Sequence, residues 1–564
     1  MRKPFLLRFL LAAVFLLTAC GAGTDSLSEG ARTPGGPAPT QREAAAPLPP
    51  QKTPTPAGSA TPTNPPPSPT PFPYVAPAWF RDASLYLIFV RSFADSDGDG
   101  VGDLNGIREH LDYVQELGVN TLWLMPIYPS PSQHGYDVTD YTAVNPQYGT
   151  LEDLQALVEA VHARGMRLIL DFVPSHLSRD HPFFQDAYAN PDSPYSDWFV
   201  WTNKAHTRYA GFAGSEAMPR FNHYNPEVVR YLSDAALFWL DLDGDGDYTD
   251  GVDGFRVDNA TFPPPEFFYA LRHAVKEANP EALLLGEAWV TSPSDLGHFF
   301  VDEFDALFDF PLYALLEGNQ NFNADGLLAG KGSPALLNVL FQEEAKSYPP
   351  EGIAVRFVSN HDTNRVATEV GGDPARERLA IAFLAALPGP PMVYYGEEIG
   401  MYGQKGGPPH WDNYRREPMD WYASEDGPDQ TTWFRPPDSW NQPEDGISVE
   451  EEAPDPASLL NFYRRALNLR REVPALRSDA MQILALDVGG PGPWGMLRGE
   501  GSGAVVALFN FGTEAQEVTL PEFPFDAAPL TDLLSGESLP AAQAGQPYTL
   551  TLPPGRAVWL KAGP

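Results

Sequence analysis

The chain of 564 residues contains little cysteine, little positive charge and few long apolar runs. Cys20 is the only cysteine, so no disulfide can form within the chain. Lysine and arginine total 37 against 74 acidic residues, which gives a formal net charge of -37. This charge would repel a polyanion and no basic stripe offsets it, so the composition argues against nucleic-acid binding. No run beyond the N-terminus is long and apolar enough to predict a transmembrane helix.

The N-terminus resembles a bacterial lipoprotein signal. Arg2, Lys3 and Arg8 form a positive region before an apolar segment, residues 9–17, which is too short to span a bilayer and is followed by Thr-Ala-Cys20. The resemblance implies that residues 1–19 are a signal peptide and that the Cys20 thiol carries a lipid. We therefore expect an extracytoplasmic chain that is lipid-anchored to the bacterial cell membrane. An ordinary signal peptide with an incidental cysteine is the alternative.

Residues 20–77 are rich in Pro, Ala, Thr, Ser and Gly, with almost no large apolar side chains before Phe72. Such a segment cannot bury enough apolar surface to fold. We expect a disordered linker, which proline keeps extended at about 3 Å per residue, so that it holds a folded domain on the order of 100 Å from the anchor. A Pro-rich binding motif is the alternative.

Beyond residue 77, short apolar runs alternate with segments of helical periodicity. The candidate strands are residues 85–90, 120–125, 166–172, 252–257, 282–285, 304–310, 353–358 and 391–395. The candidate helices are residues 107–117, 151–164, 226–240, 265–278, 375–386 and 456–471. Eight alternations predict an α/β fold, a (β/α)₈ TIM barrel over residues 78–475.

Two further segments depart from this alternation. Residues 177–225 are too long and aromatic for a simple connection, and they predict a small inserted domain after the third strand. Helical patterns stop after about residue 473, and short strand-like runs follow at residues 503–509, 548–552 and 557–560. We therefore expect a C-terminal antiparallel β-sandwich domain, residues 476–564.

Three acidic residues stand at the ends of apolar runs: Asp258, Glu287 and Asp362. Strands buried on both faces are continuous apolar runs, and barrel enzymes place their chemistry where such strands end. Cleavage of a glycosidic bond requires two carboxyl groups, one as nucleophile or base and one as acid, and Asp258 and Glu287 can fill these roles. Simple solvation is the alternative, but an acid after an apolar run is costly to bury without a task.

An acidic loop follows the first predicted strand and has the spacing of an EF-hand-type calcium loop. Oxygen-only ligands at this density suit Ca²⁺, although the loop lacks the glutamate at position 12, and an exposed acidic turn is the alternative. Positions 1, 3, 5, 7 and 9 are Asp95, Asp97, Asp99, the carbonyl of Val101, and Asp103.

A second acidic loop precedes the strand that ends at Asp258. A calcium ion there would brace that strand, and either Asp250 or Asp253 would complete its shell. The candidate ligands are Asp241, Asp243, Asp245, Asp247 and Asp250.

Seven motifs, taken in order, resemble the α-amylase family of glycoside hydrolases. Any one of them is a weak signal, whereas the ordered set is highly specific and covers about residue 79 to the C-terminus. The motifs are Gly135-Tyr-Asp-Val-Thr-Asp-Tyr141, Asp171-Phe-Val-Pro-Ser-His176, Met218-Pro-Arg-Phe-Asn222, Gly254-Phe-Arg-Val-Asp258, Gly286-Glu-Ala-Trp289, Phe357-Val-Ser-Asn-His-Asp362 and Tyr395-Gly-Glu-Glu-Ile-Gly400.

The resemblance implies a role for each of the three acids. Asp258 would attack the anomeric carbon, Glu287 would protonate the leaving oxygen and later activate water, and the α-configuration would be retained. Asp362 would hold sugar hydroxyls and stabilise the transition state. Arg256, two residues before Asp258, would keep that carboxylate ionised.

Five residues are the predicted substrate-binding group: Tyr136, His176, Arg256, His361 and Arg365. In family terms, His176 and His361 would donate hydrogen bonds to glucosyl hydroxyls, and Tyr136 would stack under the sugar ring. Arg365 either touches substrate or pairs with an acid.

Some positions depart from the family pattern. Ser175 stands where many members have an asparagine that helps to bind a calcium ion, so that particular site is in doubt. The sequence of residues 218–222 is intermediate between the forms typical of oligo-1,6-glucosidases and of neopullulanases. The sequence of residues 413–421 resembles the glucosidases. Gln133 replaces an acid that closes the pocket of exo-acting glucosidases, which favours an open, endo-acting cleft.

The resulting prediction is a retaining α-amylase that cleaves α-1,4 bonds of starch and maltooligosaccharides, binds Ca²⁺ and needs no obligate protein partner. An exo-α-glucosidase of the oligo-1,6-glucosidase type or a 4-α-glucanotransferase would use the same machinery. A non-catalytic sugar-binding lipoprotein is a further alternative, but it would be expected to have lost one of the three acids.

Overall fold

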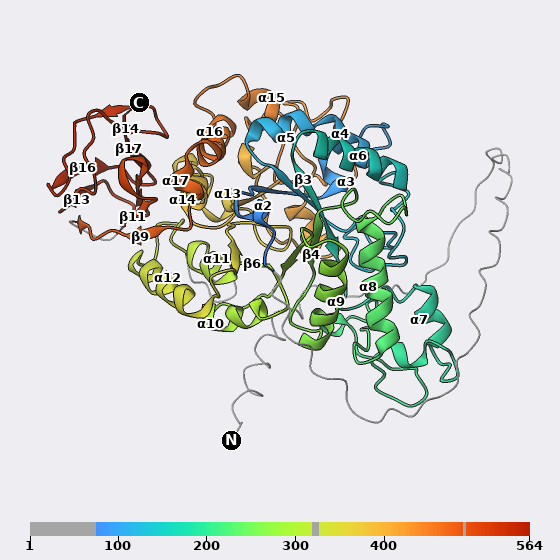
Figure 1. Ribbon diagram of the computed structural model, residues 1–564. Helices are drawn as coiled ribbons and strands as arrows, with labels where there is room; N and C mark the ends of the chain where they lie inside the picture. Colours follow the sequence, from blue (N-terminus) through green and yellow to red (C-terminus); the bar gives the residue numbers. More distant parts are fainter. Residues whose placement is uncertain (1–74, 319–325, 489–491, 564) are drawn as a thin grey trace.

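The computed structural model describes residues 75–318, 326–488 and 492–563 (Figure 1). The predicted signal peptide, Cys20 and all of the linker before residue 75 lie outside these residues. Within the described part of the chain, no helix has the length and apolar character needed to cross a membrane.

Eight parallel strands form the centre of the molecule. Strands β1 to β7 lie side by side in chain order, and β8 pairs with β1. All of their residues except Arg167 are buried, which explains why each predicted strand is a continuous apolar run. The predicted (β/α)₈ barrel is therefore confirmed. The strands are β1 (Leu85–Ile88), β2 (Thr121–Leu124), β3 (Arg167–Phe172), β4 (Gly254–Val257), β5 (Leu283–Gly286), β6 (Ala306–Phe308), β7 (Ile353–Val355) and β8 (Met392–Tyr394).

The barrel closes between β7 and β8 through a short contact. Arg356 and Pro391 form an isolated parallel bridge, and the Arg356 N–H donates to the Pro390 carbonyl at 2.8 Å. The guanidinium of Arg356 also binds the carboxylates of Asp309 and Glu344. The seam therefore depends on buried ion pairs as well as on backbone hydrogen bonds.

Helices surround the barrel (Figure 1). Five of them lie within three residues of the predicted bounds: α6 (Leu151–Ala163), α8 (Pro226–Leu240), α9 (Pro265–Ala278), α14 (Pro374–Ala386) and α16 (Leu459–Glu472). The segment predicted as one helix at residues 107–117 is two, α4 (Leu104–Glu109) and α5 (Leu111–Leu117), which meet at His110.

Further helices connect or extend these units. The longest of them is α12 (Ala335–Ser347), which the sequence pattern did not predict. The others are α2 (Ala78–Arg81), α3 (Val90–Phe93), α10 (Pro293–Leu296), α11 (Phe310–Leu316), α13 (Val366–Glu369), α15 (Val449–Glu452), α17 (Pro474–Arg477), and the 3₁₀ turns η4 (Gly297–Phe300), η5 (Glu397–Ile399), η6 (Trp411–Arg415) and η7 (Gly501–Gly503). The short helix α17 corrects the prediction that helices stop at residue 473.

Residues 177–225, between β3 and α8, contain α7 (Pro182–Ala187), η2 (Ser196–Trp198), η3 (Phe212–Gly214) and isolated bridges. Their aromatic side chains pack on one another: the rings of Phe183 and Tyr195 stack at 4.1 Å, and those of Phe184 and Trp201 at 5.5 Å. Trp198 is buried in the same cluster. The aromatic side chains of this segment therefore join the core of the barrel, because Phe184 and Trp198 belong to one continuous apolar cluster with the strands.

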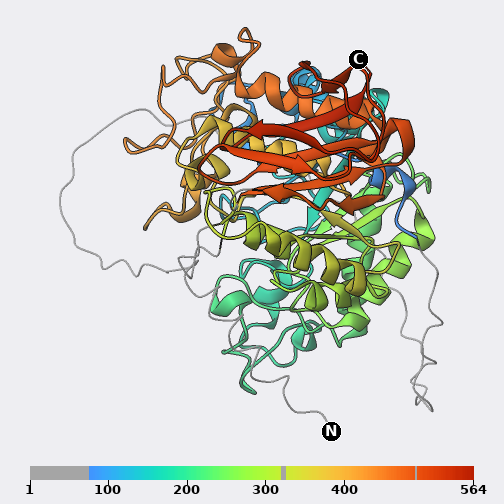
Figure 2. The ribbon, with the colours of Figure 1, turned by 90° about the vertical axis from the view of Figure 1, so that its left-hand side faces the viewer.

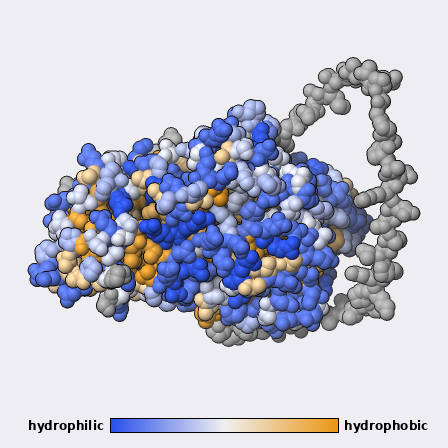
Figure 3. All heavy atoms as spheres, turned by 90° about the horizontal axis from the view of Figure 1, so that it is seen from above, coloured by the Kyte–Doolittle hydropathy of each residue, from blue (hydrophilic) through white to orange (hydrophobic). Residues whose placement is uncertain are grey.

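Two antiparallel sheets follow α17, as predicted for the C-terminus (Figure 2). Their facing residues, such as Val506, Val518 and Leu560, share a separate apolar core. Seen from above, most of the surface is hydrophilic, and apolar residues gather on the left, the side of these sheets (Figure 3). The strands are β9 (Met481–Ile483), β10 (Asp487–Val488), β11 (Pro493–Arg498), β12 (Val505–Asn510), β13 (Gln516–Leu520), β14 (Leu530–Asp532), β15 (Ser538–Leu539), β16 (Tyr548–Leu552) and β17 (Ala557–Ala562).

Helix α14 is buried nearly all round, with ten of its 13 residues buried. On the side of the C-terminal sheets, the Phe383 ring packs edge-on against Phe509 at 5.1 Å and Phe511 at 5.2 Å. At its C-terminal end, the guanidinium groups of Arg470 and Arg498 donate to the last carbonyls of the helix. These positive charges complement the negative end of the helix dipole.

Candidate functional site

Arg256 on β4 joins three carboxylates from neighbouring strands. Its Nη1 lies 2.8 Å from Asp171 on β3 and 2.9 Å from Asp258 after β4, and its Nη2 lies 2.8 Å from Glu287 after β5. The residues meet because adjacent parallel strands end side by side, with Asp171 directly opposite Arg256 in the register. The structure thus pairs Arg256 with Asp258 and adds two further acids to the same guanidinium.

The two side-chain oxygens of Asp258 have different surroundings. Oδ1 accepts a hydrogen bond from Arg256 at 2.9 Å, whereas Oδ2 is buried and has no hydrogen-bond partner among the described residues. Burial raises the pKa of Asp258 well above its ordinary value; the charge of Arg256 opposes this shift and that of Glu287 adds to it. An unpaired buried carboxylate oxygen is costly, so its presence marks a reactive position.

Glu287 is fixed by the backbone that follows Asp258. Asn259 adopts a left-handed conformation with φ of 46°, which asparagine tolerates better than most residues. This conformation directs its N–H to Glu287 Oε2 at 3.0 Å, and the next N–H, of Ala260, donates to the Glu287 carbonyl at 2.8 Å. Arg256 and Asn259 together hold both oxygens of the Glu287 carboxylate.

Asp362 stands at the more open edge of the group, with its side chain 34% exposed. Its Oδ2 lies 3.0 Å from His361 Nε2, and its Oδ1 accepts a hydrogen bond from Arg416 at 2.9 Å. Burial would raise the pKa of Asp362, but His361 and Arg416 outweigh it and hold the pKa below its usual range. Asp362 is therefore an ionised acceptor within reach of a ligand.

Tyr136 connects the two halves of the site. Its hydroxyl lies 3.0 Å from Asp171 Oδ2 and 2.7 Å from His361 Nε2, and its half-buried ring stacks on the His361 ring at 5.7 Å. Burial raises the pKa of Asp171 to about 6 against the opposing charge of Arg256. The network from Asp171 to Asp362 therefore runs through one phenol and one imidazole.

His176 lies at the start of the inserted segment and is 1% exposed. Its Nδ1 is 2.6 Å from Ser175 Oγ, and its Nε2 is buried without a partner among the described residues. Burial, with a smaller effect of His134, lowers the pKa of His176 to about 3. The imidazole is therefore neutral over the physiological range, with one ring nitrogen free.

His223 anchors the far end of the inserted segment and gives it a testable pH dependence. Its Nε2 lies 2.8 Å from the Pro174 carbonyl, and burial lowers its pKa to about 4. The unfolded chain takes up this proton near pH 6.5, so the stability contributed by neutral His223 is present above pH 6.5 and is lost as the pH falls towards 4. When the pH is lowered from 7 to 5, the free energy of unfolding of His223→Gln should fall by about 2 kcal/mol less than that of the parent.

Denaturant unfolding at the two pH values measures this difference. His273→Gln, on the exposed side of α9, is the control and should follow the parent. Parallel pH profiles of the parent and His223→Gln would contradict the expectation.

Comparison with known proteins decides the family. A family profile described as "Alpha amylase, catalytic domain" matches residues 87–479. The chain belongs to the α-amylase family. It is 35% identical to "Alpha-amylase 3" of Dictyoglomus thermophilum over 426 residues, which cover 72% of this chain and 80% of that protein.

Other members of the α-amylase family are similar over more of the chain. "Trehalose synthase/amylase TreS" of Mycobacterium tuberculosis is 30% identical over 571 residues, with 86% of this chain and 90% of that protein covered. The crystal structure of an α-amylase from H. orenii is 33% identical with a TM-score of 0.73, and the match covers 85% of this chain and 99% of that one. The protein is thus a glycoside hydrolase of this family.

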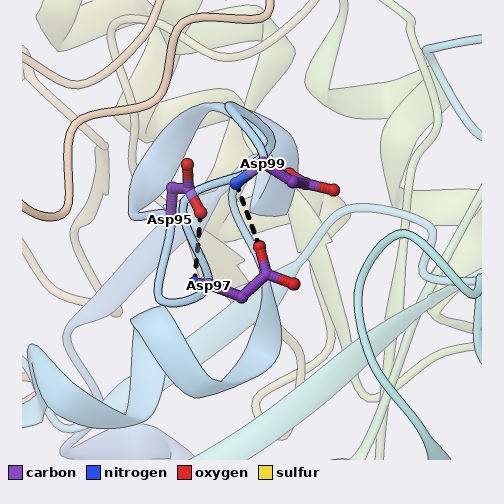
Figure 4. A group of neighbouring side chains, drawn as sticks. All are labelled: Asp95, Asp97 and Asp99. Atoms are coloured by element: carbon purple, nitrogen blue, oxygen red, sulfur yellow. Dashed lines mark hydrogen bonds between the residues drawn. The ribbon is translucent and has the colours of Figure 1, made fainter.

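The first acidic loop brings together three of its predicted ligands. Oxygens of Asp95, Asp97 and Asp99 lie within 4.8 Å of one another (Figure 4). Asp103 has another task, because its Oδ1 accepts the Gly106 N–H at 2.8 Å and caps α4. Val101 contributes its N–H to Asp99 Oδ1 at 2.8 Å. This family member therefore has a three-carboxylate group that can hold a metal, with Asp103 outside it.

The second acidic loop forms a similar group from Asp241, Asp243 and Asp250. Asp245 and Asp247 lie outside it; Asp245 Oδ1 accepts the Asp247 N–H at 2.8 Å, which shapes the turn. Asp253 is also committed elsewhere, because its buried carboxylate pairs with Arg167 and His162. Of Asp250 and Asp253, only Asp250 lies with Asp241 and Asp243 in the three-carboxylate group.

Arg365 is a predicted substrate-binding residue whose hydrogen bonds go to carbonyl groups and not to the three acids. It is 1% exposed and donates to the carbonyls of Tyr395 at 2.7 Å and Arg415 at 3.1 Å. Its guanidinium also lies over the Tyr394 ring, 4.3 Å from the centroid. These contacts argue against the substrate role and against pairing with an acid, because Nε and Nη1 bind carbonyl groups and an aromatic ring faces the guanidinium, while Nη2 is buried with no hydrogen-bond partner among the described residues.

Two site residues were missed in the sequence. Asp171 lies inside the predicted strand at residues 166–172 with Phe172 after it, and an acid within an apolar run was the signal that could have identified it. Arg416 lies in the irregular segment after β8, where no periodicity points to the barrel. Only the fold shows that this loop returns to Asp362.

Replacing Arg256 by methionine is expected to destabilise the α-amylase fold by about 3 to 5 kcal/mol, because three buried carboxylates lose their shared cation. The loss should be greater at pH 8 than at pH 5, where protonation relieves the unpaired charges. Denaturant unfolding measures the effect. The exposed pair of Arg164 and Asp112 provides the control, since Arg164→Met should cost less than about 1 kcal/mol. Equal losses in the two variants would contradict this account.

Proposed function

We propose that the protein is a retaining α-amylase that hydrolyses α-1,4-glucosidic bonds of starch and maltooligosaccharides. The observation that carries the proposal is the free, buried Oδ2 of Asp258 beside Glu287, with both carboxylates bound to the Arg256 guanidinium. Retaining glycosidases place their two carboxyl groups about 5 Å apart, and a shared guanidinium is compatible with that spacing.

In this proposal Asp258 Oδ2 attacks the anomeric carbon while Glu287 protonates the departing glycosidic oxygen. Glu287 then removes a proton from water, which releases the sugar from Asp258 with the α-configuration restored. Asp362 accepts hydrogen bonds from sugar hydroxyls and is kept ionised by Arg416. His361 and the free Nε2 of His176 supply further polar contacts.

The α-1,4 preference and the endo-acting cleft rest on Gln133 and on the relatives. Gln133 is exposed, and its Oε1 accepts a hydrogen bond from Asn413 at 3.0 Å, so no acid stands at this position. One solved relative is described as an α-amylase from Geobacillus thermoleovorans complexed with acarbose, at 28% identity and a TM-score of 0.67. Similarity to proteins named as α-amylases over most of their length supports the same activity here.

A time course of products from starch, maltotriose, isomaltose, maltose and an aryl α-glucoside tests the proposal. Maltooligosaccharides of several lengths should appear early from starch, and NMR should show the α-anomer first. Glucose alone would indicate an exo-glucosidase, longer chains a glucanotransferase, and trehalose from maltose an isomerase; each result would overturn the α-amylase assignment. A β-anomer would exclude retention.

We also propose that Ca²⁺ occupies the two carboxylate groups, at Asp95, Asp97 and Asp99 and at Asp241, Asp243 and Asp250. Hard oxygen ligands at this density favour this ion. Burial, with a smaller effect of the neighbouring Asp243 carboxylate, raises the pKa of Asp250. The ion in the second group would brace the entry to β4.

Removal of calcium is therefore expected to lower the melting temperature. An ion present at 100 times its Kd stabilises the fold by about 2.7 kcal/mol. Isothermal titration should find two ions per chain in the parent and one in Asp243→Asn. Asp234→Asn, at an acid in α8 outside both groups, is the control and should keep both. Absence of any bound ion, or of any effect of chelation on melting, would contradict the assignment.

We propose further that the mature chain begins at a lipidated Cys20 and that the division into linker (20–77), barrel (78–475) with insertion (177–225) and C-terminal β-domain (476–564) holds. The lipoprotein-like N-terminal sequence supports an extracytoplasmic, membrane-anchored enzyme. Expression with labelled palmitate should label the parent and not Cys20→Ser. Equal labelling of the two, or a membrane-bound Cys20→Ser variant, would refute the anchor.

A further inference from the structure

Arg220 lies in the inserted segment, and its guanidinium donates no hydrogen bond to any described residue. Its Nε is buried without a partner, whereas the two Nη atoms, which also lack a partner, remain accessible to solvent on a part-buried side chain. A guanidinium carries five N–H donors and no acceptor. Because a part-buried polar group normally has partners, the open donors of Arg220 are available to a ligand.

The charge of Arg220 is unpaired as well. Among the described residues no carboxylate forms an ion pair with it, although acidic residues outnumber lysine and arginine by 74 to 37 in the chain. Burial lowers the pKa of Arg220, and no described carboxylate offsets this effect, whereas the three carboxylates around Arg256 do so there. Charge balance within the chain therefore does not explain this cation.

Arg220 is one end of a continuous row of side chains. An isolated antiparallel bridge pairs it with His176, so the two side chains stand on the same face of that short ribbon. Its guanidinium lies over the Phe262 ring, 4.7 Å from the centroid. The Phe212 ring links the two ends, at 5.4 Å from Phe262 and 4.4 Å from His176. We call these four side chains the insertion wall.

The insertion wall stands on the side of Glu287. Phe262 follows Asp258 by four residues in the loop after β4, and in this loop the Ala260 N–H donates to the Glu287 carbonyl at 2.8 Å. In the proposed reaction Glu287 protonates the departing oxygen, so the sugar that leaves lies on this side of the cleavage point. Arg220 is thus placed to meet the leaving part of the substrate.

The free edge of the guanidinium indicates what kind of group it binds. Phe262 covers one face, which leaves the two Nη groups in the plane of the group. Such a fork matches the oxygens of a phosphate or a carboxylate, and charge-assisted hydrogen bonds are roughly twice as strong as those to a neutral hydroxyl. A phosphate monoester carries about −1.5 to −2 charges and three acceptor oxygens, so it gains more from an unshared cation than a carboxylate does.

We propose that Arg220 binds a phosphate monoester on the leaving part of the substrate, so that the enzyme cleaves phosphorylated α-glucans in preference to neutral ones. The substrate class rests on the proposed function, while the unpaired guanidinium does not. Both Nη groups donate to phosphate oxygens, and Phe262 holds the plane of the guanidinium in position. No bond to phosphorus forms or breaks, and the phosphate departs on the released sugar.

The test compares maltotetraose with two isomers that carry a phosphate at O6 of the last or of the second-last glucose at the reducing end. The parent should cleave one phosphorylated isomer with a kcat/KM about tenfold higher or more than that on maltotetraose. Arg220→Met should abolish this preference. Arg220→Lys should keep part of it, because lysine retains the charge without the planar fork.

Arg208→Met is the matched control, since Arg208 is an exposed arginine of the same inserted segment. It should keep the full preference. A maltotetraose with a carboxylate at the corresponding C6 should be cleaved less well than the phosphorylated isomer. Equal kcat/KM on the phosphorylated and neutral substrates, an unchanged preference in Arg220→Met, or a carboxylate preferred to the phosphate would overturn the proposal.

Calorimetric titration separates this proposal from the α-amylase assignment, because the full chain carrying Asp258→Asn binds without hydrolysis. The preferred phosphorylated isomer should bind about tenfold more tightly than maltotetraose, and adding Arg220→Met should remove the difference. If the parent hydrolyses starch without any preference, the phosphate site is refuted and the assignment stands. If the parent hydrolyses no α-glucan while the phosphorylated isomer still binds through Arg220, the assignment fails and the phosphate site stands.

Discussion

Replacing Asp258 by asparagine is expected to lower kcat/KM on starch by about 10⁴-fold or more, equivalent to a loss of about 5.5 kcal/mol of transition-state stabilisation. The amide keeps an oxygen that can accept the hydrogen bond from Arg256, so the site retains its shape. It removes the free carboxylate oxygen at Oδ2, which is the atom placed to form the bond to the sugar. Initial rates from reducing-end release measure the effect.

Folding and substrate binding should survive this change. The melting temperature should stay within a few degrees of the parent, and maltotriose should still bind, because only the reacting atom has been altered. Asp180→Asn, at an exposed acid beyond β3, is the control and should keep full activity. Hydrolysis by Asp258→Asn within tenfold of the parent would show that another group is the nucleophile.

The loss of rate in Glu287→Gln is expected to depend on whether the leaving group of the substrate needs a proton. An acid catalyst typically contributes about 10² to 10⁴ in rate, and this amount should be lost on starch, whose alkoxide leaving group needs a proton. With α-maltosyl fluoride, which leaves without a proton, the first step should stay close to the parent rate. The glutamine keeps the size of the side chain, but its amide has one acceptor oxygen where the carboxylate has two, so it can accept from Arg256 or from the Asn259 N–H and not from both.

The second half of the reaction gives an independent readout for Glu287. Because the same carboxylate would activate water, Glu287→Gln should accumulate a covalent maltosyl adduct on Asp258 when it reacts with the fluoride. Mass spectrometry of the intact protein detects the adduct, and Asp258→Asn supplies the negative control. Equal losses of rate on starch and on the fluoride would argue that Glu287 has no proton-transfer role.

The strands were predictable because burial on both faces leaves a simple signal in the sequence. Each of the eight apolar runs overlaps the strand that the structure shows there; seven contain their strand, and β5 extends one residue beyond its run, to Gly286. The break between α4 and α5 was not predictable, since it lies at His110 with neither glycine nor proline at the junction. Helix α12 was missed because its buried face includes Glu344, which pairs with Arg356 and interrupts the apolar periodicity.

The candidate site was predictable where chemistry follows a strand and unpredictable where it depends on a loop. Asp258 and Glu287 come at strand ends, so the barrel alone brings them together. Arg416 reaches Asp362 from an irregular segment, and no local pattern reports such a long-range contact. Arg365 shows the opposite error: a charged residue close to Asp362 in sequence is directed away from it by the turn into α13.

The metal loops show how far spacing alone can be used. Alternating aspartates mark the two loops, but three of the nine predicted aspartates, Asp103, Asp245 and Asp247, do not join the three-carboxylate groups. The distinction depends on which way each side chain points in a tight turn, and the sequence does not contain that information.

Helix α14 has a consequence for how this enzyme can be divided. Because the C-terminal sheets cover Phe383 and supply Arg498 to the end of that helix, a chain cut after the barrel would expose aromatic surface and leave helix carbonyls without a donor. The catalytic half is therefore not an independent module. Domain exchange between relatives will succeed only where α14 and the sheet that covers it are transferred as one unit.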